Sequence, residues 1–102
     1  MASTRPDFDL INRTALAALP VLLRRWLPEG HQRGREWVAR NPTRKDRRLG
    51  SFSIDTSTGR WADFADSPSA KGGDVVSLYA YLRNIGQRDA ACELADILRI
   101  NQ

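Results

Sequence analysis

The sequence predicts an α+β fold in which a three-stranded antiparallel sheet is flanked by N-terminal and C-terminal helices. Near both ends of the chain, apolar residues recur at spacings of three and four, which is the helical period. In the middle, aromatic and aliphatic residues alternate with polar ones, which is the period of a strand. The 102 residues, 41% hydrophobic and 27% charged, suffice for a single domain over 1–102 with a modest core.

An N-terminal helical segment is expected within residues 1–30. Its apolar positions are Leu10, Leu16, Leu19, Leu22, Leu23 and Trp26. Pro20 interrupts the pattern, because proline removes a backbone donor and clashes with the preceding turn. Proline is tolerated in a first turn, so we predict one helix ending near Leu19 and a second beginning at Pro20. The sequence Pro28-Glu29-Gly30 should end this segment.

Three short alternating runs, 36–40, 51–55 and 60–64, predict the three strands. Residues 56–59 would join the second strand to the third as a four-residue hairpin loop, with Gly59 adopting a positive φ angle. The charged segment 41–50 is expected to be an exposed loop. The stretch 65–73 is rich in glycine and small residues, and predicts an irregular crossing.

Two helices are predicted after this crossing. Asp74 is a candidate N-cap for the first, whose apolar stripe is Val75, Leu78, Tyr79 and Leu82, and Asn84 to Gly86 provides the stop signal. The second helix follows at once. Its apolar stripe is formed by Ala90, Ala91, Leu94, Ala95, Ile97 and Leu98.

Positive charge is concentrated in the middle of the chain. The net charge is +4, and residues 31–60 carry eight Arg or Lys against three acidic residues. The densest cluster contains Arg40, Arg44, Lys45, Arg47 and Arg48. Such a run is either a solvated charged loop or a site for a phosphate backbone. Aromatic residues on the neighbouring strands could then stack on single-stranded bases, although we expect most of them to lie in the core.

Catalytic residues are difficult to assemble from this sequence. The one histidine, His31, has no partner nearby in the sequence for general-base work. The one cysteine, Cys92, is expected to be a half-buried structural thiol, and it excludes an internal disulfide. The sequence Lys71-Gly72-Gly73-Asp74 lacks the spacing of a P-loop. Because no catalytic pair can be assembled, we expect that the chain is not an enzyme by itself. There is neither a membrane-length apolar run nor a signal-peptide core, so we expect a cytoplasmic protein.

Several motifs resemble the N-terminal zinc-finger domain of bacterial and phage-type DNA primases. They are Asn41-Pro42, Gly50-Ser51-Phe52-Ser53-Ile54, Gly59-Arg60-Trp61-Ala62-Asp63-Phe64, Lys71-Gly72-Gly73-Asp74-Val75-Val76 and Ala90-Ala91-Cys92-Glu93-Leu94-Ala95. The resemblance covers 34–98, and primase-helicases of phages, plasmids and integrated elements are the most similar in this respect. It implies a zinc-ribbon-like domain that presents single-stranded template DNA during replication.

The zinc pattern of that family is missing here. Asn41 and Arg44 stand where the family has Cys and His, and Asp63 and Asp66 stand near the position of its Cys pair. No tetrahedral zinc site can be built from these residues, so the resemblance implies a form without metal or other cofactor. We expect Arg44 to form an ion pair or forked hydrogen bond with Asp63 or Asp66 across the former site.

The resemblance also implies a function and a partner. We expect a nucleic-acid-binding module that contacts single-stranded DNA and serves a primase catalytic domain or helicase in cis or in trans. The alternative is a protein-interaction module that docks to a polymerase, a helicase or a second copy of itself through its apolar helices. The predicted DNA-binding residues are Arg40, Arg44, Lys45, Arg47, Arg48, Lys71 and, as the most exposed aromatic, Trp61.

Overall fold

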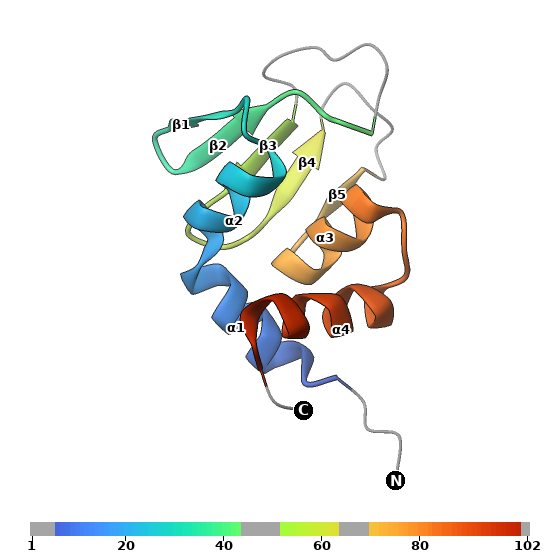
Figure 1. Cartoon of the computed structure of the whole chain (residues 1–102). Helices are drawn as coiled ribbons and strands as arrows, with labels where there is room; N and C mark the ends of the chain where they lie inside the picture. Colours follow the sequence, from blue (N-terminus) through green and yellow to red (C-terminus); the bar gives the residue numbers. More distant parts are fainter. Residues whose placement is uncertain (1–5, 44–51, 64–69, 101–102) are drawn as a thin grey trace, which may run out of the picture.

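The computed structural model describes residues 6–43, 52–63 and 70–100 (Figure 1). Four helices and five strands occur within these ranges. In chain order they are α1 (Phe8–Ala17), α2 (Leu19–Trp26), β1 (His31–Arg33), β2 (Glu36–Ala39), β3 (Phe52–Asp55), β4 (Trp61–Asp63), β5 (Lys71–Gly72), α3 (Val75–Arg83) and α4 (Gln87–Leu98). The α+β class is therefore as predicted.

The sheet has five strands, and the prediction of a three-stranded sheet is wrong. Its order is β1-β2-β3-β4-β5, and every neighbouring pair is antiparallel. The two missed strands are the edges. All three residues of β1 are exposed, so the strand has no apolar alternation, and β5 has only two residues. Edge strands of this kind are formed by pairing with a neighbour and leave little trace in the local sequence.

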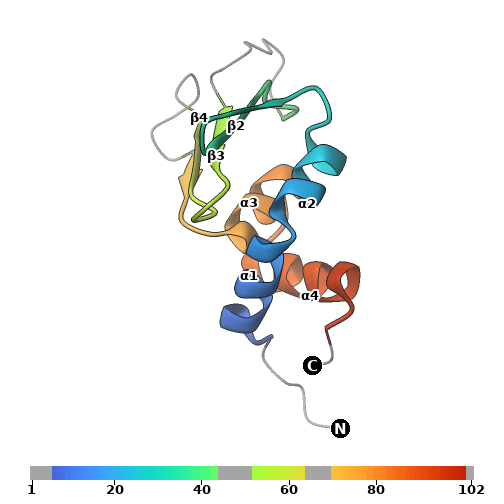
Figure 2. The same cartoon turned by 90° about the vertical axis from the view of Figure 1, so that its left-hand side faces the viewer.

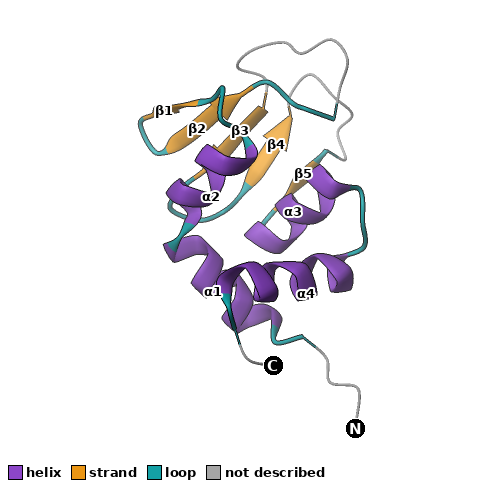
Figure 3. Cartoon of the chain, in the orientation of Figure 1, coloured by secondary structure: helices purple, strands orange, loops and turns teal. Residues whose placement is uncertain are grey.

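Two layers are visible in perpendicular views of the chain. Helices α2 and α3 lie against one face of the sheet, and α1 and α4 pack together at the opposite end of the molecule (Figures 1 and 2). Helices and strands are thus largely segregated (Figure 3). The register places Trp37, Ile54 and Trp61 in one row across the sheet, on the face that α2 and α3 cover.

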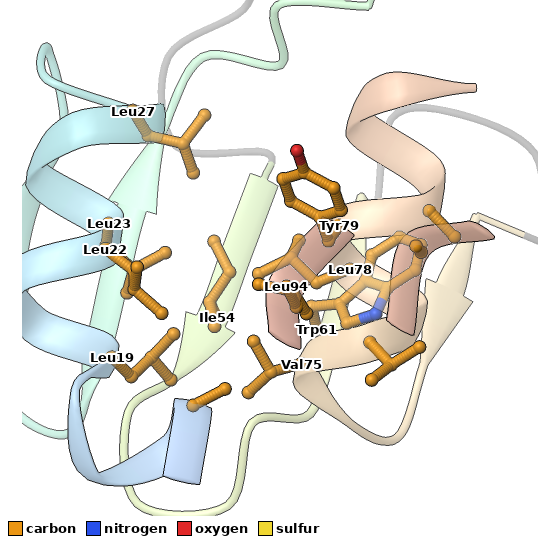
Figure 4. Close-up of a cluster of buried hydrophobic side chains, with 14 of the residues drawn as sticks. Leu19, Leu22, Leu23, Leu27, Ile54, Trp61, Val75, Leu78, Tyr79 and Leu94 are labelled. Carbon is orange, nitrogen blue, oxygen red and sulfur yellow. The ribbon is translucent and has the colours of Figure 1, made fainter. Parts of the chain in front are cut away.

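A single hydrophobic cluster joins these elements. Side chains from α2 approach Ile54 of the sheet from one side, and Val75 and Leu78 of α3 approach it from the other (Figure 4). Ala90, Ala91, Leu94 and Ala95 of α4 extend the same cluster. The predicted stripe of α4 is wrong at Ile97, which is 38% exposed. The N-terminal helices and the sheet therefore share one core.

The local signals for turns and caps agree with the structure. The helical segment breaks at Ala18, and Pro20 lies in the first turn of α2. Gly59 has a φ of 82° in the loop between β3 and β4, as predicted. Asp74 caps α3 by accepting a hydrogen bond from the Ser77 N–H at 2.8 Å. Asn84 ends α3 in the left-handed region, with a φ of 56°.

Each of two buried tryptophans in the sheet packs against a glycine. Trp37 donates its indole N–H to the Leu27 carbonyl at 3.1 Å, and Trp61 donates to Ser77 Oγ at 2.9 Å. A Cβ atom at Gly72 would lie 2.5 Å from Trp61 Nε1, and one at Gly30 would lie 2.8 Å from Trp37 Cε2. Glycine at these two positions therefore lets the indoles pack against the backbone.

Candidate nucleic-acid interface

The predicted DNA-binding residues divide into two groups. Arg44, Lys45, Arg47 and Arg48 lie outside the described residues, and their role stays a prediction. Arg40 follows β2 and is exposed, and Lys71 lies exposed on β5. Three strand spacings separate β2 from β5, or about 14 Å at about 4.8 Å per step. The structure therefore does not place Arg40 beside Lys71.

Trp61 is not the exposed aromatic that we predicted. Its side chain is 5% exposed, and its ring centroid lies 4.7 Å from that of Tyr81 and 6.1 Å from that of Phe52. The alternation along β4 directs Trp61 to the face that the helices cover, where an indole buries more apolar area than it could at the surface. Trp61 belongs to the core, and the stacking role expected for it is wrong.

The other face of the sheet carries a shallow hollow of about 720 Å³. Its middle is formed by the small side chains of Ser53 and Ala62, which are paired across β3 and β4. Lys71 pairs with Ala62 at one side, and Arg60 lines the hollow as well. The carboxylates of Glu36 and Asp55 also lie in the lining, which Trp61, Gly72 and Gly73 complete. This surface is open and carries charges of both signs.

The charges around this hollow differ in how they are paired. Glu36 accepts a short hydrogen bond from Ser53 Oγ, and Asp55 Oδ2 lies 3.7 Å from an Arg35 nitrogen. Among the described residues, Arg60 and Lys71 take part in no ion pair. These two cations are therefore available to an anionic ligand.

Asp55 is stabilised as a carboxylate by its own turn. The Ser57 hydroxyl donates to Asp55 Oδ1 at 2.6 Å, and the Ser57 backbone N–H donates to the same oxygen at 2.8 Å. These two hydrogen bonds, with the attraction of Arg35, lower the pKa of Asp55 below its usual value. The negative charge at this side of the hollow persists to low pH.

A buried polar cluster links the ends of β2 and β4, and sequence reasoning did not foresee it as a unit. Asn41 is 1% exposed and Asp63 is 3% exposed. Asn41 Nδ2 donates to Asp63 Oδ2 at 2.7 Å and to Tyr81 Oη at 2.8 Å. Asn41 Oδ1 accepts hydrogen bonds from the Thr43 backbone N–H at 2.8 Å and from Thr43 Oγ1 at 2.7 Å. The cluster thus fixes the chain up to the residue before Arg44.

The cluster occupies the place where we expected an Arg44 clamp. Arg44 and Asp66 lie outside the described residues, so an ion pair of Arg44 with either carboxylate stays a prediction. The link observed here is made by the Asn41 amide, which donates to Asp63 directly. Within residues 6–43, 52–63 and 70–100, no group of three His, Cys, Asp or Glu side chains could hold a metal ion. The sequence signal for the cluster was a pair of polar residues at strand ends, since Asn41 follows β2 and Asp63 ends β4.

No family model matches the chain, and neither the curated proteins nor the solved structures contain a match to it. No helix in the described part of the chain is both long enough and apolar enough to cross a bilayer.

Proposed function

We propose that the chain is a nucleic-acid-binding accessory module of a DNA primase or primase-helicase, and that it contacts single-stranded DNA. The observation that carries this proposal is the distribution of charge. The described residues contain eleven Lys or Arg and ten Asp or Glu, whereas residues 44–48 contain four Lys or Arg and one Asp. Excess positive charge is therefore concentrated between β2 and β3, in a segment whose cations would displace counterions from a phosphate backbone.

The described structure supports this proposal at both ends of that segment. The chain enters it from Thr43, which the Asn41 cluster holds, and returns from it at Phe52, a fully buried residue of β3. Fixed attachment points reduce the conformational entropy that the segment would lose on binding. Arg60 and Lys71, on the open face of the sheet, would add two further phosphate contacts.

The module binds and does not catalyse. Phosphate contacts fix the position of a strand and carry no sequence information, so we expect little sequence preference. Synthesis of a primer would require a primase catalytic domain, in cis or in trans, with the present chain holding the template.

Titration of a fluorescein-labelled oligo(dT) at several salt concentrations tests this function. Replacing Arg44, Lys45, Arg47 and Arg48 with alanine should weaken binding and flatten the log–log salt slope by about 0.7 for each phosphate that is no longer neutralised. The matched control replaces four exposed arginines elsewhere, Arg13, Arg33, Arg35 and Arg88, and removes the same charge. Equal effects of the two quadruple variants would show that net charge alone acts, and would refute a role for residues 44–48.

A protein-interaction module is the second candidate. It is favoured by two apolar side chains that remain exposed on helices, Val21 at 60% and Ile97 at 38%. Association through such side chains would depend little on salt, whereas phosphate binding falls steeply as salt rises. Self-association that persists at about 0.5–1 M salt, measured by light scattering on a chain that binds no oligonucleotide, would favour this alternative.

A further inference from the structure

We propose that Trp26, at the end of α2, is the residue on which an unpaired base of the bound strand stacks. This inference rests on the proposed function and extends it, because it assigns the base-contacting residue that Trp61 cannot be. Trp37 is 8% exposed and Trp61 is 5% exposed, whereas Trp26 is only partly buried, at the margin of the core. Trp26 is therefore the tryptophan with a ring accessible to a ligand.

The indole of Trp26 differs from the other two in its hydrogen bonding. Trp37 and Trp61 each donate their N–H to a protein acceptor. Trp26 makes no hydrogen bond to any described residue, and no buried side-chain donor is left unsatisfied in the described part of the chain. Its N–H therefore faces solvent and is free to donate to a base or a phosphate. A tryptophan with an apolar body and an accessible N–H is typical of binding surfaces.

Two small hollows flank Trp26, and Trp26 and Pro42 line both of them. The first, of about 220 Å³, is completed by Leu27, Pro28, Glu29, Ala39, Arg40 and Asn41. The second, of about 180 Å³, is completed by Tyr79, Leu82 and Arg83. Both are below the roughly 300–1,000 Å³ of sites for drug-sized ligands, so each is of a size for a single planar ring.

The ring of Trp26 is held in place by the ring of Tyr79. Its centroid lies 5.2 Å from that of Tyr79, with the two planes tilted by 49°. Tyr79 is in turn fixed by a hydrogen bond from its hydroxyl to Glu93 Oε1 at 2.8 Å. A ring fixed in this way loses little side-chain entropy when a base stacks on it, which favours binding.

The arginines beside Trp26 favour a nucleic acid as the partner. Each hollow has an arginine in its lining, Arg40 in the first and Arg83 in the second. Each guanidinium faces one carboxylate, at 3.8 Å and 3.5 Å respectively. Exposed pairs of this length are worth little and exchange readily for a phosphate. Pro42, which lines both hollows, precedes the basic residues 44–48 by two positions in the sequence.

Two oligonucleotides of equal length test the inference, oligo(dT) and an abasic strand that has the same phosphates but no bases. Stacking predicts that the unmodified protein binds oligo(dT) more tightly, and that its tryptophan fluorescence is quenched by oligo(dT) and not by the abasic strand. Trp26→Leu keeps an apolar side chain and removes the aromatic face. It should weaken oligo(dT) binding between about 5-fold and about 150-fold and leave abasic binding unchanged. Val21→Ala, which changes another exposed apolar residue of α2, is the matched control and should change neither.

The outcomes separate this inference from the function on which it rests. Salt-dependent binding with equal affinity for the two oligonucleotides would overturn the role of Trp26 and leave the proposed function standing. No binding of either strand would overturn both. If Trp26→Leu abolishes self-association in light scattering while oligo(dT) binding is unchanged, the surface belongs to a second copy of the chain, and the stacking role is refuted. Fluorescence quenching in the unmodified protein provides a readout that does not depend on how well a variant folds.

Discussion

Replacing Asn41 with alanine removes four hydrogen bonds at a position that is 1% exposed. The bond to the Asp63 carboxylate is worth about 1.5–3 kcal/mol and each bond to a neutral partner about 0.5–1.5 kcal/mol. The variant also leaves a buried carboxylate without one of its donors. We therefore expect a loss of about 3–7 kcal/mol in the free energy of unfolding. For a chain of this size, that loss lowers Tm by at least about 12 °C.

Urea and thermal unfolding followed by circular dichroism measure this loss. Tyr81→Phe removes one hydroxyl of the same cluster and should cost only about 1 kcal/mol. Asn41→Asp places a second carboxylate against Asp63. It should be destabilised at neutral pH and recover part of its stability on acidification, because one protonated carboxyl can then donate to the other. A loss below about 1 kcal/mol for Asn41→Ala, with no recovery of Asn41→Asp in acid, would refute the reasoning.

Three further predictions concern the rest of the fold. Gly72→Ala should lower the free energy of unfolding, measured with urea, by about 1–3 kcal/mol, because the new methyl would clash with the Trp61 indole. The control Gly73→Ala, whose methyl would meet nothing within 4 Å, should change it by less than about 1 kcal/mol. Because the pKa of Asp55 is lowered on folding, its carboxylate stabilises the folded state above its unfolded pKa, and this stabilisation is lost as pH falls below about 4. Asp55→Asn should therefore flatten the fall in stability that the protein shows in acid. EDTA should leave Tm unchanged, since the chain has one cysteine and one histidine and a structural zinc site needs about four such ligands; stoichiometric zinc in the purified protein would contradict this.

The helices and the three inner strands could be predicted because each has a signal in its own residues. Pro20 indicated the break between α1 and α2, and Asp74 and Asn84 indicated the two ends of α3. These signals act within one or two turns of the backbone. The loop after β3 was predictable for the same reason, since Gly59 supplies the positive φ angle.

The edge strands and the site could not be predicted in this way, since pairing with distant residues produces them. The strand β5 depends on the contact of Gly72 with the Trp61 indole, eleven residues earlier. Alternation along β4 could place Trp61 on one face, but it could not reveal which face the helices cover. The hydrogen bond between Asn41 and Asp63 spans 22 residues, and its existence depends on the register of three strands.

The packing of α1 against α4 at the end remote from the sheet determines how the protein can be attached to a surface. The described chain begins beside α1 and ends beside α4, and both helices lie away from the ends of β2 and β4 (Figures 1 and 2). A biotin or affinity tag at either terminus would therefore tether the molecule by its helical end. In a biosensor experiment the immobilised protein would present the ends of β2 and β4 toward the flowing analyte, and N-terminal and C-terminal attachment should yield the same affinity.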